Sequence, residues 1–463
     1  MKSRKLNAIV FFIAGILLIP QLSWAQQTTE SSRLSLDQPL TLEECVQYAL
    51  DNNYNLRATK LQEGIAETQV GETRAIGLPQ ASIGSNLNYN YEIQRVFLPN
   101  SIITGDTAAT GNTPAQFSTQ YDANAAFSVS QLLFDGSYFV GLQAAKTLRE
   151  LRQKESQQAE IVTVENVTKA YYTVLINQER LKLVDANIEQ LQKLYKDTKA
   201  LYDNGFAENI DVDRVQVNLN NTRTEKNKLD RGISYALNLL KFQMGVSINT
   251  AISLSGDVEQ LSLNVTDYLQ PESSFDYKQR IEYKILNVNN QLTQLDLKNN
   301  KVSHLPTLSA NFRYGYNTGV NDFDQIGNFP NRWFSFGSVG LSFQWRLFTG
   351  LSRSYKMEKN RIQLDQLEVQ REQLENSIDL ELNQLKDNLR SLKEELDIQD
   401  DNRKLANKVF DQSQIKYNNG VGSSTELIEA ETARKTAETN YFNALYDAVI
   451  TKIELERALG ILY

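Results

Sequence analysis

An internal duplication is the feature that most limits what this chain can fold into. A shift of 215 positions carries the stretch from Tyr202 to Gly245 onto the stretch from Tyr417 to Gly460 without a gap, and both begin with Tyr-x-x-Gly. Upstream, Leu78-Pro79 recurs as Leu305-Pro306, and Leu133-Phe134-Asp135-Gly136 recurs as Leu347-Phe348-Thr349-Gly350. Because these landmarks recur in the same order, we interpret the chain as two copies of one unit, at residues 41–250 and 271–463, joined by a link at 246–274.

Two proline-free stretches, 115–270 and 331–463, are where long helices fit, because proline breaks a helix interior. Both stretches contain residues spaced by three and four positions, which is the pattern of a coiled-coil seam. The seam residues are Leu181, Val184, Ile188, Leu191, Tyr195, Thr198 and Tyr202 in the first stretch, and Leu374, Ile378, Leu382, Leu385, Leu389, Leu392 and Leu396 in the second.

The landmarks also set the lengths of these helices. They predict a helix of 67 residues before each Tyr-x-x-Gly turn (137–203 and 351–417) and a return helix of 37 residues after it (209–245 and 424–460). At 1.5 Å per residue, these helices are about 100 Å and about 55 Å long. The return helix therefore reaches only about half the height of the long helix. An opening helix in each unit, for example 41–78, can cover the other half, so we expect the link near mid-height.

Four segments alternate apolar and small polar residues with the period of two that is typical of β-strands. They are 80–93, 120–133, 307–318 and 333–347, which gives one two-stranded hairpin per unit. Alternation alone also fits a soluble hairpin packed on a core. The small polar faces, strand lengths close to the 9 to 11 residues that cross a bilayer, and aromatic residues toward the strand ends favour a membrane instead. The expected membrane-interface aromatics are Tyr89, Tyr91, Tyr314, Tyr316, Trp333 and Trp345.

Four strands are too few to close a sheet in lipid. Unpaired edge N–H and C=O groups are very costly there, so other copies of the chain must complete the sheet. Two copies would give about eight strands with a filled interior, whereas three would give about twelve and leave room for water. We therefore expect an α+β membrane protein in which four transmembrane strands per chain complete a trimeric 12-stranded β-barrel, and long coiled-coil helices form a periplasmic helical barrel.

The N-terminus has the pattern of a secretory signal. Lys2, Arg4 and Lys5 precede an apolar run at 8–19, and Ser23-Trp24-Ala25 offers small residues for cleavage. We expect residues 1–25 to be removed and residues 26–463 to be exported. Cys45 lies well beyond the cleavage point, so we expect no N-terminal lipid and interpret this residue as a small buried hydrophobe. We find no apolar run of the roughly 18 residues that a transmembrane helix needs.

The composition argues against several chemistries. The net charge of −8 argues against nucleic acid as a partner. One cysteine and one histidine are too few for a disulfide framework or a transition-metal cluster, so we expect no metal and no cofactor. We also find no phosphate-binding glycine loop and no convergent nucleophile, acid and base, and therefore expect no enzyme.

The signal, the duplication, the Leu-Pro and Leu-Phe-x-Gly junctions, and Tyr-x-x-Gly before Asp211-Val212 and before Glu426-Leu427-Ile428-Glu429-Ala430 together resemble the TolC-like outer-membrane efflux proteins over residues 41–463. The resemblance implies a homotrimeric exit duct in outer-membrane lipid. It also implies docking to a periplasmic membrane-fusion adaptor and a proton-driven or ATP-driven inner-membrane pump, with small molecules or polypeptides passing outward. The alternative is a soluble periplasmic coiled-coil adaptor.

The resemblance also assigns residues to the periplasmic tips. It places Tyr202, Gly205, Asp211, Tyr417 and Gly420 in adaptor-contacting turns. Ordinary helix capping accounts for both glycines equally well.

The resemblance makes Glu426 and Glu429 a constriction of the periplasmic entrance. For Glu426, a capping box with Ser423 and the helix dipole form the alternative explanation. The Gly420-Val421-Gly422 turn lacks a basic residue at the position where the family can carry one that helps to hold the entrance shut.

Overall fold

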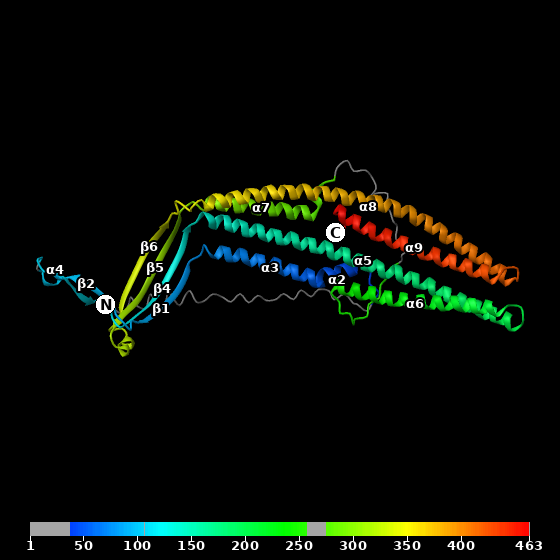
Figure 1. Ribbon diagram of the computed structural model, residues 1–463, viewed down its shortest axis with the longest axis horizontal. Coiled ribbons are helices and arrows are strands. Elements are labelled where there is room, and N and C mark those ends of the chain that lie inside the picture. Colours follow the sequence, from blue (N-terminus) through cyan, green and yellow to red (C-terminus); the bar gives the residue numbers. More distant parts are fainter. Residues whose placement is uncertain (1–37, 106, 257–274, 463) are drawn as a thin grey trace.

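The computed structural model describes residues 38–105, 107–256 and 275–462. The expected signal and residues 257–274 of the expected link lie outside the described residues. A four-stranded sheet forms one end of the molecule, and two long helical hairpins run from it to the opposite end (Figure 1).

Each repeat contributes one long helix and one return helix, which pack on each other as an antiparallel pair. The pairs are α5 (Gly136–Asp203) with α6 (Asn209–Met244), and α8 (Ser352–Asn418) with α9 (Ser424–Leu459). The long helices end at turns in which Gly205 and Gly420 have φ values of 78° and 73°, a conformation that strains residues with a Cβ. Among the described helices, none has the length and apolarity required to cross a bilayer.

Three shorter helices cover the part of the molecule between the sheet and mid-height: α2 (Leu42–Asn52), α3 (Tyr54–Ala75) and α7 (Ile281–Val302), the last preceded by η2 (Tyr277–Gln279). Asn53 separates α2 from α3, and its side chain accepts a hydrogen bond from the backbone N–H of Leu56 at 3.0 Å. α3 packs on α5, whereas α7 packs on both α5 and α8. The second repeat is therefore attached to the first along this whole section.

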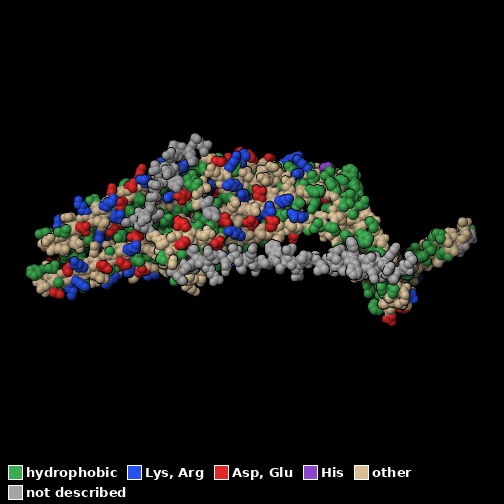
Figure 2. Space-filling model, turned by 180° about the vertical axis from the view of Figure 1, so that it is seen from behind, with side chains coloured by type: hydrophobic (Ala, Val, Ile, Leu, Met, Phe, Trp, Pro, Cys, Tyr) green, Lys and Arg blue, Asp and Glu red, His purple; other side chains and the backbone are tan. Residues whose placement is uncertain are grey.

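The main sheet is antiparallel, with the order β1 (Gln80–Tyr89), β4 (Tyr121–Phe134), β5 (Thr307–Val320) and β6 (Phe334–Gln344). β4 and β5 join the two repeats, with Val129 opposite Phe312, and β5 pairs with β6, with Phe312 opposite Val339. β1 and β6 are the outer edges. Apolar side chains of the sheet, Val339 among them, are exposed, and they gather over this end of the molecule while charged side chains cover the helices (Figure 2).

A second, two-stranded sheet extends beyond the main one. It consists of β2 (Arg95–Pro99) and β3 (Asn112–Gln116), joined through α4 (Asn100–Thr104). This sheet is not predicted by the alternation of residues, because residues 104–116 have the composition of a polar loop. The connection between β5 and β6 contains the short helix η3 (Phe323–Gly327).

The largest hydrophobic core lies at mid-height, where α2, α5, α6 and α9 meet. Cys45 is fully buried in it, and this burial raises the pKa of its thiol to about 12. The hydroxyl of Tyr171 donates a hydrogen bond to the carbonyl of Ser255, and Leu40 forms a parallel bridge with Leu254. The described part of the link, residues 246–256, therefore lies against this core.

Candidate functional site: the tips of the two long hairpins

The two helix–helix turns lie together at the end of the molecule farthest from the sheet (Figure 1). Phe206 in the first turn and Val421 in the second occupy equivalent positions, and their side chains are 82% and 79% exposed. Tyr202 is also exposed, but the hydroxyl of Tyr417 lies 3.0 Å from the hydroxyl of buried Thr198. The tips thus present two apolar side chains to solvent, and Tyr417 ties the second hairpin to the first.

Two polar contacts join the first turn of α6 to the first turn of α9. The hydroxyl of Ser424 donates a hydrogen bond to the carboxylate of Asp211. Nη1 of Arg214 donates to the hydroxyl of Thr425 at 2.8 Å, and the same Nη1 lies 3.8 Å from Oδ1 of Asp211. Of these four residues, only Asp211 is among the tip residues expected from the sequence. The others carry no motif, and the pairing depends on how the two repeats lie side by side.

The expected entrance residues, Glu426 and Glu429, are both exposed in the first turns of α9. Ser423 caps this helix by accepting a hydrogen bond from the backbone N–H of Glu426 at 3.1 Å. The carboxylate of Glu426 accepts a hydrogen bond from Nζ of Lys416 at 3.2 Å, across the turn. Lys416 thus supplies a basic group four residues before Gly420, in a turn where Gly422 carries none.

A buried polar cluster lies behind the tips, between α5 and α9. The guanidinium of Arg434 donates to the side-chain oxygens of Asn187 at 2.6 Å and Gln190 at 2.9 Å, and lies over the ring of Phe410. Its Nη2 is 2.7 Å from the carboxylate of Glu431, although the geometry does not make a hydrogen bond. Burial raises the pKa of Glu431 despite the opposing effect of Arg434. The cluster fixes α9 on α5 at one height.

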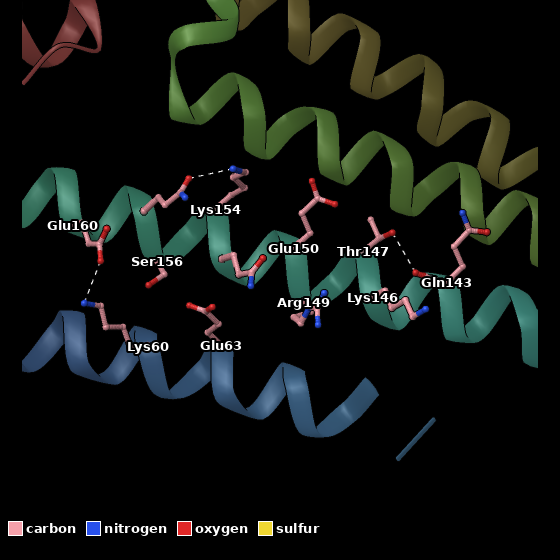
Figure 3. Close-up of a pocket in the computed structure, with 12 residues that line it drawn as sticks. Lys60, Glu63, Gln143, Lys146, Thr147, Arg149, Glu150, Lys154, Ser156 and Glu160 are labelled. Atoms are coloured by element: carbon pink, nitrogen blue, oxygen red, sulfur yellow. Dashed lines mark hydrogen bonds and ion pairs between the residues drawn. The ribbon is translucent and has the colours of Figure 1, made fainter. Parts of the chain in front are cut away.

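A surface groove with a volume of about 930 Å³ lies between α3 and α5 (Figure 3). Its lining carries both signs of charge, with Lys60 and Glu160 joined at 3.1 Å across the two helices. Such alternation is typical of a solvated helix surface. The described residues contain no cluster of His, Cys, Asp and Glu that would hold a metal ion.

The expected interface aromatics lie at different heights of the sheet. Tyr89 ends β1, Tyr91 follows it, and Trp333 precedes β6, all at the end away from the helices. Nε1 of Trp345 donates to the carbonyl of His304, beside the helices, at 2.9 Å. Tyr314 and Tyr316 lie within β5, and Tyr314 is at its centre, opposite Phe127 and Gly337.

The combination of an apolar four-stranded sheet with two open edges and two long duplicated helical hairpins defines the class of channel subunits that join a membrane sheet to a helical duct. The profile of the family described as "Outer membrane efflux protein" matches residues 45–246 and 287–461. The chain belongs to this family, and it is an outer-membrane efflux channel protein. The family membership confirms the resemblance seen in the sequence and does not support a soluble adaptor.

Individual relatives agree with this assignment. The chain is 21% identical over 428 residues to outer membrane protein TolC of Vibrio cholerae, with 91% of each chain covered. It is 27% identical over 225 residues to a probable efflux pump outer membrane protein, TtgC, of Pseudomonas putida, covering 48% of this chain and 43% of that protein. Both relatives are named as outer-membrane proteins, and the second as part of an efflux pump.

Solved structures share the fold. A membrane protein from Pseudomonas aeruginosa matches with a TM-score of 0.70 at 17% identity, covering 90% of this chain and 92% of that one. The CmeC outer membrane channel of Campylobacter jejuni matches with a TM-score of 0.68 at 14% identity, covering 91% and 86%.

Proposed function

We propose that three copies of this chain form the exit duct of a tripartite efflux or type I secretion system. In this proposal, residues 1–25 are removed on export and the mature chain carries no N-terminal lipid. The sheet of each copy enters the outer membrane and the helices extend into the periplasm. Small molecules or polypeptides pass from a proton-driven or ATP-driven inner-membrane pump, through a periplasmic adaptor, to the exterior.

The observation that carries the proposal is that both the sheet and the row of helices end, on two sides of the molecule, in an element that has no neighbour on its outer side within the described chain. β1, α3 and α6 lie along one side of the molecule, and β6 and α8 lie along the other (Figure 1). In lipid, the backbone groups of β1 and β6 need partners, which only another copy can supply. Head-to-tail pairing of β6 with β1 of the next copy gives about twelve strands for three copies, enough for a water-filled interior.

The helices support the same arrangement. Within the chain, α9 packs on α5. In the duplicated chain, α6 is equivalent to α9, and α8 is equivalent to α5. By analogy with the packing of α9 on α5, we expect α6 to pack on α8. The chain's own α6 packs on α5, so the α6 that meets α8 must come from another copy.

The tips of the two hairpins would both contact the adaptor and form the periplasmic entrance. The exposed Phe206 and Val421, beside Tyr202, Gly205, Tyr417 and Gly420, offer apolar contacts to an adaptor at both turns. Glu426 and Glu429 of three copies would place six carboxylates around one opening. The contacts of Asp211 with Ser424, and of Arg214 with Thr425, would hold each pair of tips together when the entrance is closed.

The test measures mass and conductance. The mature chain is purified in detergent, its mass is determined by light scattering, and it is added to planar bilayers. We expect the mass of three copies and discrete, large conductance steps. A single copy that is monodisperse in plain buffer and has no affinity for bilayers would overturn the proposal.

A further inference from the structure

The long helices of the two repeats, α5 and α8, bury residues at equivalent positions. Thr163, Val167 and Val174 are buried on α5, and the residues 215 positions later on α8, Ile378, Leu382 and Leu389, are buried as well. α6 and α9 have 36 residues each and start 215 positions apart. Each contact between α5 and α9 within the chain therefore identifies a pair of positions where α8 of one copy should meet α6 of the next.

At mid-height, the contact within the chain is ionic. Nε of Arg457 on α9 lies 3.2 Å from the carboxylate of Glu165 on α5. Nζ of Lys169 on α5 lies 2.8 Å from the carboxylates of both Glu165 and Glu454. These side chains are mostly buried, so the charges are held in pairs away from bulk water.

Three of the four equivalent positions carry apolar side chains, and the fourth, that of Lys169, carries Gln384. Glu165 corresponds to Leu380 on α8, and Glu454 and Arg457 correspond to Leu239 and Phe242 on α6. In the single chain, Leu380 is 68% exposed, Phe242 is 56% exposed and Leu239 is 42% exposed. Three large apolar side chains thus face solvent at the positions where the duplicated contact would bury them.

The same replacement occurs nearer the tips. Arg434 contacts Gln190 within the chain. The equivalent residues are Leu219 on α6 and Leu405 on α8, and Leu405 is 60% exposed. Here too the polar contact has apolar equivalents, but only Leu405 is left for another copy to cover, because Leu219 is already buried within its own chain.

We infer that α8 of one copy docks on α6 of a second copy through an apolar contact of Leu380 with Leu239 and Phe242, in place of the ion pairs that join α5 to α9 within each chain. This inference rests on the proposed ring of copies. The occupant is a second copy because α6 is the repeat equivalent of α9, and because α6 and α8 lie on the same two sides of the molecule as the open edges of the sheet (Figure 1).

The two interfaces exclude each other by their chemistry. If α9 of one copy docked on α8 of another, Glu454 would be buried against Leu380 without Lys169, and Arg457 would lose Glu165 and keep only Glu381 of its own chain. Burying unpaired charges is strongly unfavourable, so each helix accepts only its proper neighbour.

Charge substitutions provide the first test. Leu380→Glu places an unpaired carboxylate in the contact and is expected to lower the temperature at which the detergent-solubilised oligomer dissociates. Adding Phe242→Arg recreates the Glu165–Arg457 pair between copies and is expected to restore that temperature. Val162→Glu is the matched control, because Val162 is an exposed apolar residue on α5, which is neither of the two helices of the proposed contact. An oligomer that is equally stable with Leu380→Glu and with Val162→Glu would overturn the inference.

Cross-linking provides a second test that does not depend on stability. Leu380→Cys and Phe242→Cys are combined with Cys45→Ala, treated with a short bis-maleimide and separated on denaturing gels. We expect covalent ladders ending at three copies, and no ladder with either cysteine alone. A wild-type protein that is not trimeric by light scattering would refute the proposed trimer. A trimeric wild type without ladders would refute only this contact.

Discussion

Gly245 and Gly460 end the return helices at equivalent positions, but only Gly245 is pressed against another backbone. Their φ values are nearly equal, 75° and 73°. A Cβ on Gly245 would lie 2.3 Å from the carbonyl oxygen of Asn52, whereas a Cβ on Gly460 would be 3.6 Å from that of Gln279. At mid-height, the end of the return helix therefore packs more closely on the backbone before it in the first repeat than in the second.

This difference predicts unequal effects of the same substitution. Gly460→Ala should cost about 1 to 2 kcal/mol, because a non-glycine residue is forced into the left-handed region. Gly245→Ala should cost clearly more, because the backbone of Asn52 must also move. Thermal unfolding followed by circular dichroism in detergent measures both variants, and equal losses would contradict the prediction.

The tip contacts predict a gating effect. Removing a contact of about 1 kcal/mol shifts a two-state ratio about fivefold, so Arg214→Ala should increase the fraction of time spent in high-conductance states by that order. Ser424→Ala, which removes the contact with Asp211, should act in the same direction. Single-channel recordings test both variants. Lys228→Ala, an exposed charge on the same helix, serves as the control and should leave the recordings unchanged.

The carboxylates of the entrance predict ion selectivity. Glu426→Ala with Glu429→Ala should weaken the preference for cations in planar bilayers, because a ring of carboxylates attracts them. Lys416→Ala should strengthen that preference, because Lys416 otherwise neutralises Glu426. Reversal potentials in a salt gradient measure the selectivity. The control is Glu394→Ala with Asp397→Ala, an acidic pair with the same spacing far from the tip. If this double variant weakened the preference for cations equally, the result would argue against a ring at the entrance.

Glu431 predicts a pH dependence of stability. Burial raises its pKa above the usual 4.5, so the folded protein holds this proton more tightly than the unfolded chain does. The resulting stabilisation is complete below 4.5 and is lost as the pH rises through the folded pKa. Glu431→Gln should therefore be at least as stable as the wild type at pH 7.5, with the difference shrinking toward pH 4.5. Melting curves of both proteins across this pH range test the prediction. It would be contradicted if the stability difference between Glu431→Gln and the wild type grew on acidification.

The long helices were predictable because their signals are local. Proline-free stretches and seams with three- and four-residue spacing mark helices wherever they occur, and α5 starts at Gly136, one residue before the expected position. The opening helix of the first unit was expected to be continuous from 41 to 78. That expectation was wrong, because Asn53 interrupts it and caps α3 with its side chain.

Other features depend on relationships that a linear sequence does not display. β2 and β3 contain Pro99 and Pro114, which argue against strands except at sheet edges, and this isolated two-stranded sheet consists only of edges. The contacts of Asp211 with Ser424 and of Arg214 with Thr425 join residues more than 200 positions apart. Each of the four is an ordinary residue near the start of a helix, so only their placement in space shows that they act together.

In the proposed ring of three copies, the two different edges of each copy have a genetic consequence. A copy in which one edge is damaged can still join its neighbours through the intact edge, and it then leaves the ring open. In a cell that also makes the normal protein, such a variant would spoil assemblies that contain normal copies. Mutations at one edge should therefore be dominant, whereas mutations that prevent the chain from folding at all should be recessive.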